Sequence, residues 1–308
     1  MQLQPIHIYD SEWSGTFPHL VAPKHDEWLP GLLLRCDKVN CWSSGTTFAH
    51  LLRSISSYPL RGKSSWIVVP RMVLELLAQL LAIPLSTVVA TTYNAELALL
   101  YDTSSPHPTY MERSLRFRLC PDCIAEMKLL NRLFALPDIT CCPFHQLQLV
   151  NSCQCDTRLH IFHKQALPFT CHNCSLNWAN LPLLTADPEC LSIEHKLLLH
   201  YEFFFTKGTP TLLTKALQLV RETVKRKKTP WVKCSDGSSK YVECYDGKRI
   251  SLGSLVQMLV GLNLTPRDVE DYEGVLPWWS MKIQTEREYF SNIHNTFAIG
   301  ENTSTGAT

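Results

Sequence analysis

Apolar residues recur at helical spacing in the first part of the chain. The pattern predicts a helix over 32–38 and a second helix over 46–54. Large apolar side chains just before and inside the first helix are most simply interpreted as core residues. They are Trp28, Leu32, Leu33 and Leu34.

A longer apolar pattern covers residues 69–102 and is interrupted around Pro84. It predicts a helix of about nine residues, a short turn, and a second helix that begins near Ser86, which is the layout of a helix-turn-helix. The second helix, over 86–97, contains no Arg or Lys that could contact phosphates or guanines. We therefore favour a protein-docking surface or a core role for this pair over DNA reading.

The C-terminal part predicts a helix over 214–231 and a second helix-turn-helix-like pair over 250–274. The last helix of that pair starts at Pro266 and is acidic, so DNA would repel it. The tail over 301–308 is polar and is predicted to be disordered. A basic run ends the 214–231 helix and is either solvated or in contact with a phosphate backbone. The run is Lys225, Arg226, Lys227 and Lys228.

Composition places limits on the function. The 308 residues are 45% hydrophobic and carry a formal net charge of +1, so nucleic-acid binding would need a local basic patch. No apolar run approaches the ~20 residues of a membrane span, and the start of the chain does not resemble a signal peptide. We expect a soluble cytoplasmic protein, and hence reduced cysteines that bind metal more often than they form disulfides.

Thirteen cysteines are present, and eight of them lie between residues 120 and 174. The first set pairs a C-x2-C turn with a C-x2-H turn eighteen residues later, a spacing typical of a four-ligand zinc site. Cys141 could replace its neighbour Cys142 as a ligand, but we rank Cys141 second because it would lengthen the second turn to C-x3-H. The predicted ligands are Cys120, Cys123, Cys142 and His145.

The second set pairs a C-x-C turn with a C-x2-C turn fifteen residues later. Three histidines close by, His160, His163 and His172, could replace a thiolate but are more simply interpreted as surface residues. The cysteines outside both sets are most simply buried or bystander residues. The predicted ligands of the second set are Cys153, Cys155, Cys171 and Cys174, and the five cysteines outside residues 120–174 are Cys36, Cys41, Cys190, Cys234 and Cys244.

Two chemical alternatives are weaker than a structural role for zinc. A catalytic zinc keeps an open position and a nearby base, yet each set offers four protein ligands. Asp122 and Asp156 flank the ligands without the spacing of a known hydrolytic motif. A redox dithiol at Cys120 and Cys123 would need a surrounding βαβ pattern that is not predicted. We expect closed structural zinc sites and no enzymatic activity.

The predicted fold class is mostly α-helical, with a small central double zinc-ribbon module and helix-turn-helix-like segments. The expected domains are an N-terminal helical domain over 1–110, the zinc-binding module over 111–185 and a C-terminal helical domain over 186–300. Structural zinc stabilises a segment with little core of its own, by on the order of 10 kcal/mol in small finger peptides. A helix over 124–137, ending at Pro137, is expected between the two halves of the first zinc set.

The motif E-x-L-P-G-L-L-L-R over 27–35, followed by Asn40, precedes the sequences RFRLCPDC over 116–123 and CCPFHQLQL over 141–149. This order of motifs resembles the TniQ/TnsD family of target-selection proteins of heteromeric and CRISPR-associated DNA transposons. The resemblance spans roughly residues 20–180. Two features depart from it: a tryptophan common between the first pair of turns is missing, and the second set begins C-x-C instead of C-x2-C.

The resemblance implies a non-catalytic adaptor that links a target-recognition device to an AAA+ ATPase, which recruits the transposase. In one branch of the family that device is a Cascade-type guide-RNA complex, and in the other the protein itself binds an attachment site on target DNA. The modest length and the acidic last helix favour the guide-complex branch. A site-specific target selector and a zinc-containing transcription regulator are the alternatives, and a homodimer is possible.

Overall fold

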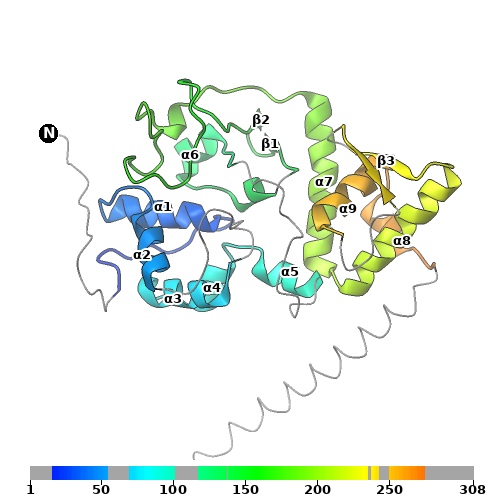
Figure 1. Cartoon of the computed structure of the whole chain (residues 1–308), viewed down its shortest axis with the longest axis horizontal. Coiled ribbons are helices and arrows are strands. Elements are labelled where there is room, and N and C mark those ends of the chain that lie inside the picture. The colour runs from blue at the N-terminus through cyan, green and yellow to red at the C-terminus, as the bar shows by residue number, and fades with distance from the viewer. Residues whose placement is uncertain are drawn as a thin grey trace, which may run out of the picture.

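A computed structural model describes residues 16–54, 69–100, 117–136, 138–234, 237–242 and 250–274 (Figure 1). Helices dominate these residues and the strands are short, which confirms the predicted mostly helical fold class. The predicted tail over 301–308, the domain boundary near residue 110, Pro137 and Cys244 all lie outside the described residues.

The first two helices are α1 (Leu29–Val39) and α2 (Thr46–Ser54), which confirms both helices predicted in this region. Proline in the first turn of α1 suits a position where no backbone donor is needed. The buried Asp37 joins the two helices, because its carboxylate accepts hydrogen bonds from Gly45 N (2.7 Å), Thr47 N (2.7 Å) and the Thr47 hydroxyl (2.6 Å). These donors belong to the start of α2, so Asp37 holds that helix end against α1.

The segment predicted as a helix pair contains three helices, α3 (Arg71–Leu81), α4 (Leu85–Val89) and α5 (Asn94–Leu100). The break after α3 is confirmed: Ala82 adopts a left-handed conformation (φ 53°) before Pro84. The continuous second helix over 86–97 is wrong. Thr91 and Thr92 direct their hydroxyls to backbone carbonyls three residues earlier, at 2.7 Å, and such bonds compete with helix propagation.

The cysteine-rich segment contains α6 (Pro121–Met127), a 3₁₀ helix over Arg132–Ala135, the antiparallel pair β1 (Cys141–Cys142) and β2 (Leu147–Gln148), and a 3₁₀ helix over Trp178–Asn180. The helix predicted over 124–137 is wrong. The α6 helix ends at Lys128, whose φ of 51° is left-handed. The chain then turns so that Leu130 accepts a hydrogen bond from Trp28 N at 2.7 Å.

Gly31 permits this close approach. A Cβ atom at this position would lie 3.0 Å from the backbone nitrogen of Leu130 and 3.1 Å from its Cβ. Nine in ten real Cβ contacts are looser than that, so a larger residue here would push α1 away from the cysteine-rich segment.

The C-terminal region begins with the long helix α7 (Pro188–Lys207), followed by α8 (Pro210–Arg226), the hairpin of β3 (Trp231–Lys233) and β4 (Ser239–Tyr241), α9 (Leu252–Gly261) and α10 (Pro266–Glu270). The α8 helix begins earlier than the predicted start at Thr214 and ends at Arg226, within the basic run predicted to end it. The predicted pair over 250–274 is present as α9 and α10, with Thr265 and Asp268 forming a capping box at the start of α10.

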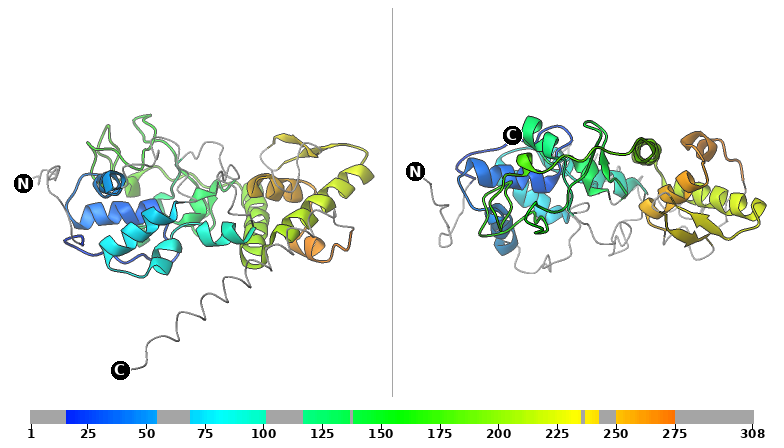
Figure 2. Two further views of the ribbon diagram at one scale, coloured as in Figure 1. Left: turned by 60° about the horizontal axis from the view of Figure 1, so that its bottom comes forward. Right: turned by 90° about the horizontal axis from the view of Figure 1, so that it is seen from above.

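Figure 2 shows the N-terminal helices and the cysteine-rich segment on one side of the molecule and α8–α10 on the other, with α7 between them. One continuous apolar core nevertheless runs through both sides, from Phe17 to Val269. A second, small cluster is built from Cys120, Cys123, Phe134 and Cys142. Among the helices described, none combines the length and apolarity needed to cross a membrane.

Candidate metal centres

Local backbone geometry brings the first set of predicted ligands together. Cys120 caps the start of α6 and Cys123 lies in the first turn of that helix. Cys142 ends β1, and His145 lies in the turn that leads to β2, where Gln146 has a left-handed φ of 54°. The helix start and the hairpin turn therefore present two ligands each from opposite sides.

The distances within this group match a tetrahedral zinc site. His145 Nδ1 lies 3.5 Å from Cys120 Sγ, 3.4 Å from Cys123 Sγ and 3.5 Å from Cys142 Sγ. The sulfurs of Cys123 and Cys142 are 3.7 Å apart. Ordinary zinc bond lengths give tetrahedron edges of about 3.8 Å between sulfurs and about 3.6 Å between sulfur and nitrogen. The four side chains thus already surround a volume of the size of the ion.

A carboxylate orients the histidine of this group. His145 Nε2 lies 3.0 Å from Glu126 Oε2, so the other ring nitrogen faces the three sulfurs. Glu126 belongs to α6, the same helix that carries Cys123. This carboxylate–histidine arrangement is the usual outer contact of a zinc-bound imidazole, and the sequence analysis did not identify it.

The second set also converges. The sulfurs of Cys153 and Cys174 are 3.4 Å apart and those of Cys155 and Cys171 are 3.7 Å apart. All four sulfurs lie within 4.8 Å of one another. The shorter C-x-C turn therefore provides two ligands despite its unusual spacing.

Backbone contacts shape both turns of this second group. Asp156 has a left-handed φ of 59°, which closes the C-x-C turn. Hydrogen bonding with Thr157 lowers the pKa of the Cys155 thiol to about 6, and this favours the thiolate form that binds metal. Burial raises the pKa of Cys153 to about 12. A cation at the centre of the group would favour both thiolates.

The histidines considered as alternative ligands lie apart from the sulfur group. The rings of His163 and His172 stack with their centroids 4.2 Å apart, and His160 packs edge-on against His172 at 5.2 Å. None of the three belongs to the groups of side chains able to hold a metal among the described residues. Cys141, the rival to Cys142, faces Cys190 instead, at 3.2 Å.

Each of the two groups offers four protein ligands, so a bound ion would have its coordination completed by the protein. Such closed sites stabilise a fold, whereas a hydrolytic zinc keeps one position for water. The donor sets, three sulfurs with one imidazole and four sulfurs, suit zinc. Cysteine groups that could hold zinc thus lie in the middle of a helical protein.

The motif over 27–35 forms a buried ion pair. Arg35 donates from Nε to Glu27 Oε1 (2.7 Å) and from Nη2 to Glu27 Oε2 (2.5 Å), a bidentate arrangement. The Glu27 side chain is completely buried and that of Arg35 is 15% exposed. Lys24 N also donates to Glu27 Oε2, at 3.0 Å. The pair fixes the approach of the chain to α1.

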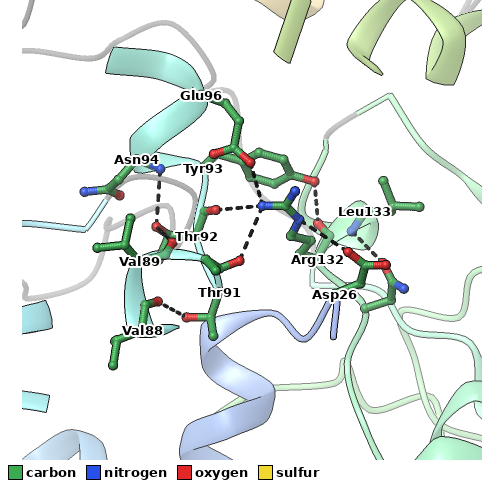
Figure 3. A network of polar contacts seen from close by, with 12 residues as sticks. Asp26, Val88, Val89, Thr91, Thr92, Tyr93, Asn94, Glu96, Arg132 and Leu133 are labelled. Atoms are coloured by element: carbon green, nitrogen blue, oxygen red, sulfur yellow. Dashed lines mark hydrogen bonds and ion pairs between the residues drawn. The ribbon is translucent and has the colours of Figure 1, made fainter. Parts of the chain in front are cut away.

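A second cation ties the cysteine-rich segment to the N-terminal helices (Figure 3). Arg132, in the 3₁₀ helix, donates to Glu96 Oε1 at 2.6 Å and to the carbonyl of Thr92 at 3.1 Å. Its guanidinium lies over the ring of Tyr93, 4.9 Å from the centroid, and the Tyr93 hydroxyl donates to Arg132 O at 3.1 Å. Charge, ring and backbone contacts together fix how the two parts pack.

The predicted basic patch lies at the exposed end of α8. All four side chains from Lys225 to Lys228 are exposed, and Arg226 forms an ion pair with Glu222 at 3.7 Å. The acidic helix α10 uses its charges locally, because Asp268 caps the helix and Glu270 pairs with Lys207 at 2.8 Å. The structure therefore leaves the end of α8 as a basic surface.

These observations define a class: a mostly helical protein that carries two adjacent four-ligand groups of the zinc-ribbon type. The TniQ family model matches residues 18–149, which include the buried Glu27–Arg35 pair and all four ligands of the first group. The chain therefore carries a TniQ family domain, as the sequence motifs predict. No curated protein matches the chain. A TniQ domain indicates a protein of transposition target selection.

Proposed function

We propose that this protein is a non-catalytic targeting adaptor for DNA transposition, which connects a Cascade-type guide-RNA complex to an AAA+ ATPase that recruits the transposase. The TniQ family match over 18–149 carries the proposal, since it spans the N-terminal helices and the first cysteine group. The closed ligand groups support it, because they offer a rigid scaffold in place of an open catalytic centre.

We also propose two structural zinc ions, one in each group of four ligands. The first would be held by Cys120, Cys123, Cys142 and His145, and the second by Cys153, Cys155, Cys171 and Cys174. The side chains of both groups have zinc-like spacing. Substituting one ligand in each group, Cys123→Ser or Cys174→Ser, should remove one ion per chain in metal analysis, with Cys41→Ser as a control outside both groups.

The adaptor role is tested by size-exclusion chromatography of the purified protein with its cognate guide-RNA complex, with the candidate ATPase and with duplex DNA alone. Stable co-elution with the guide complex, together with weak retention on free DNA, is the expected result. Sequence-specific binding to duplex DNA without the guide complex would instead identify a self-sufficient target selector or a zinc-containing regulator.

The exposed basic end of α8 favours that second candidate function, a site-specific selector that contacts DNA directly. Lys225, Arg226, Lys227 and Lys228 form a compact positive surface, and phosphate contacts of this kind give a strong dependence of binding on salt. Changing all four to Gln should weaken DNA-dependent assembly and reduce its salt slope if they touch phosphate. Changing Lys207 and Lys215, which contact Glu270, is the matched control.

A further inference from the structure

A third group of metal-binding side chains lies outside the two zinc-ribbon groups. It consists of Cys141, Cys190 and Glu194, each offering one ligand atom within 4.8 Å of the others. Successive side chains of a strand point to opposite faces, so Cys141 faces away from the first zinc group although its neighbour Cys142 belongs to that group. Cys190 and Glu194 lie four residues apart on α7, and hence on one face of the helix.

The environment of Glu194 points to a bound cation. Its side chain is buried, with a residue exposure of 4%. Oε1 accepts hydrogen bonds from Thr140 N, the Thr140 hydroxyl (2.6 Å) and Cys141 N (2.7 Å). Oε2 is buried and has no hydrogen-bond partner among the described residues. A buried carboxylate oxygen without a partner is costly, and a cation beside it removes that cost.

The two sulfurs supply the softer part of the donor set. Cys141 Sγ and Cys190 Sγ are 3.2 Å apart. A tetrahedral zinc dithiolate needs about 3.8 Å, so the sulfurs would separate by roughly half an ångström. A disulfide, at about 2.05 Å, would require them to approach by more than about 1 Å. The smaller adjustment, with a carboxylate beside both sulfurs, favours a metal over a disulfide.

We propose that Cys141, Cys190 and Glu194 form a third site for a thiophilic divalent cation, with zinc as the best match to two thiolates and a carboxylate. Cys190 is partly exposed, so the fourth position is open to water. Binding would release the two thiol protons. The ion would then compensate two of the three negative charges carried by the two thiolates and the carboxylate.

The position of the site gives it a structural consequence. Cys141 belongs to the β1–β2 hairpin of the cysteine-rich segment, and the other two ligands belong to α7, the helix that begins the C-terminal region (Figure 1). An ion here would join these two parts of the molecule. Sequence spacing did not indicate the site, because 49 residues separate Cys141 from Cys190.

The test is the metal content of the full chain after gel filtration in reducing buffer with micromolar zinc. We expect three zinc ions per chain in the wild type and two in Cys190→Ser and in Glu194→Gln. Cys41→Ser, an exposed cysteine outside every group, should keep three. Cys123→Ser should lose a different ion, so the double variant with Cys190→Ser should retain only one.

Replacement of zinc by Co²⁺ gives a second readout: the third site supplies two of the nine sulfur ligands, so the sulfur-to-metal absorption band should lose about a fifth of its intensity in Cys190→Ser. Circular dichroism checks that the variants keep their helices. Two ions in the wild type, or three that Cys190→Ser leaves in place, would overturn the proposal. A Cys141–Cys190 disulfide found by peptide mapping, with only two ions present, would overturn it in favour of a redox pair. These outcomes do not depend on the adaptor role.

Discussion

Replacing Glu27 by Gln isolates the electrostatic part of the buried Glu27–Arg35 pair. The substitution keeps the shape of the side chain and removes its charge. Glu27 accepts one donor at Oε1 and two at Oε2, so the amide nitrogen of Gln would face at least one N–H group. Arg35, whose side chain is only 15% exposed, would lose its counter-charge.

Breaking a buried pair from one side costs about 3–5 kcal/mol, because a charge is left uncompensated. At about 2–4 °C per kcal/mol for a chain of this size class, the melting temperature should fall by roughly 6–20 °C. We expect the same variant to lose the register of α1 against the cysteine-rich segment, since Glu27 forms a backbone bridge with Asn131. Thermal unfolding followed by far-UV circular dichroism at fixed zinc concentration measures the change.

The chain offers a matched control in the pair of Arg71 and Glu75, which are 2.7 Å apart with side chains 81% and 44% exposed. Glu75→Gln should cost less than about 1 kcal/mol. Combining Glu27→Gln with Arg35→Met should recover part of the loss, with a coupling energy of about 0.5–3 kcal/mol. Equal effects of Glu27→Gln and Glu75→Gln would refute the reasoning.

Three further perturbations test the metal groups, a buried carboxyl and the basic patch. Cys123→Ala should release the zinc ion of the first group and destabilise the cysteine-rich segment, and a variant that keeps both its stability and its zinc would contradict the structural role. Burial raises the pKa of Asp37 to about 6, so the folded state holds this proton more tightly than the unfolded state. The stability of the wild type relative to Asp37→Asn should therefore fall by roughly 3 kcal/mol between about pH 4 and pH 6, as urea unfolding at several pH values would show; a pH-independent difference would exclude the shift. Changing Lys225–Lys228 to Gln should lower the salt slope of DNA-dependent assembly, measured by fluorescence anisotropy, and an unchanged slope would identify the run as a solvated helix end.

Short-range patterns in the sequence were enough to predict the first two helices and the grouping of the ligand residues. Apolar spacing in the first 54 residues correctly predicts α1 and α2, because helix periodicity is set by neighbours three and four residues apart. The cysteine spacing groups the ligands into the same two sets of four that the structure brings together. Each turn brings its own two ligand residues together. The longer spacing between turns therefore served only to predict which turns share a site.

Tertiary packing decided the features that local sequence patterns did not predict. The helix predicted over 124–137 ends at Lys128, because the chain there turns to pair with Trp28 and Asn131 lies against Glu27. A local pattern cannot report such contacts. The network around Arg132 draws its partners from residues about 40 positions away.

The third ligand group shows most clearly the difference between what local spacing predicts and what tertiary packing decides. Cys190 and Glu194 share a helix face, which their spacing predicts, but nothing in that spacing indicates that β1 brings Cys141 beside them. The sequence by itself therefore determined α1 and α2, the two sets of four ligand residues and the family motifs, all of which depend on residues near one another in the chain. Only the tertiary structure decided which distant side chains share a buried space, because that depends on how the finished helices and turns pack.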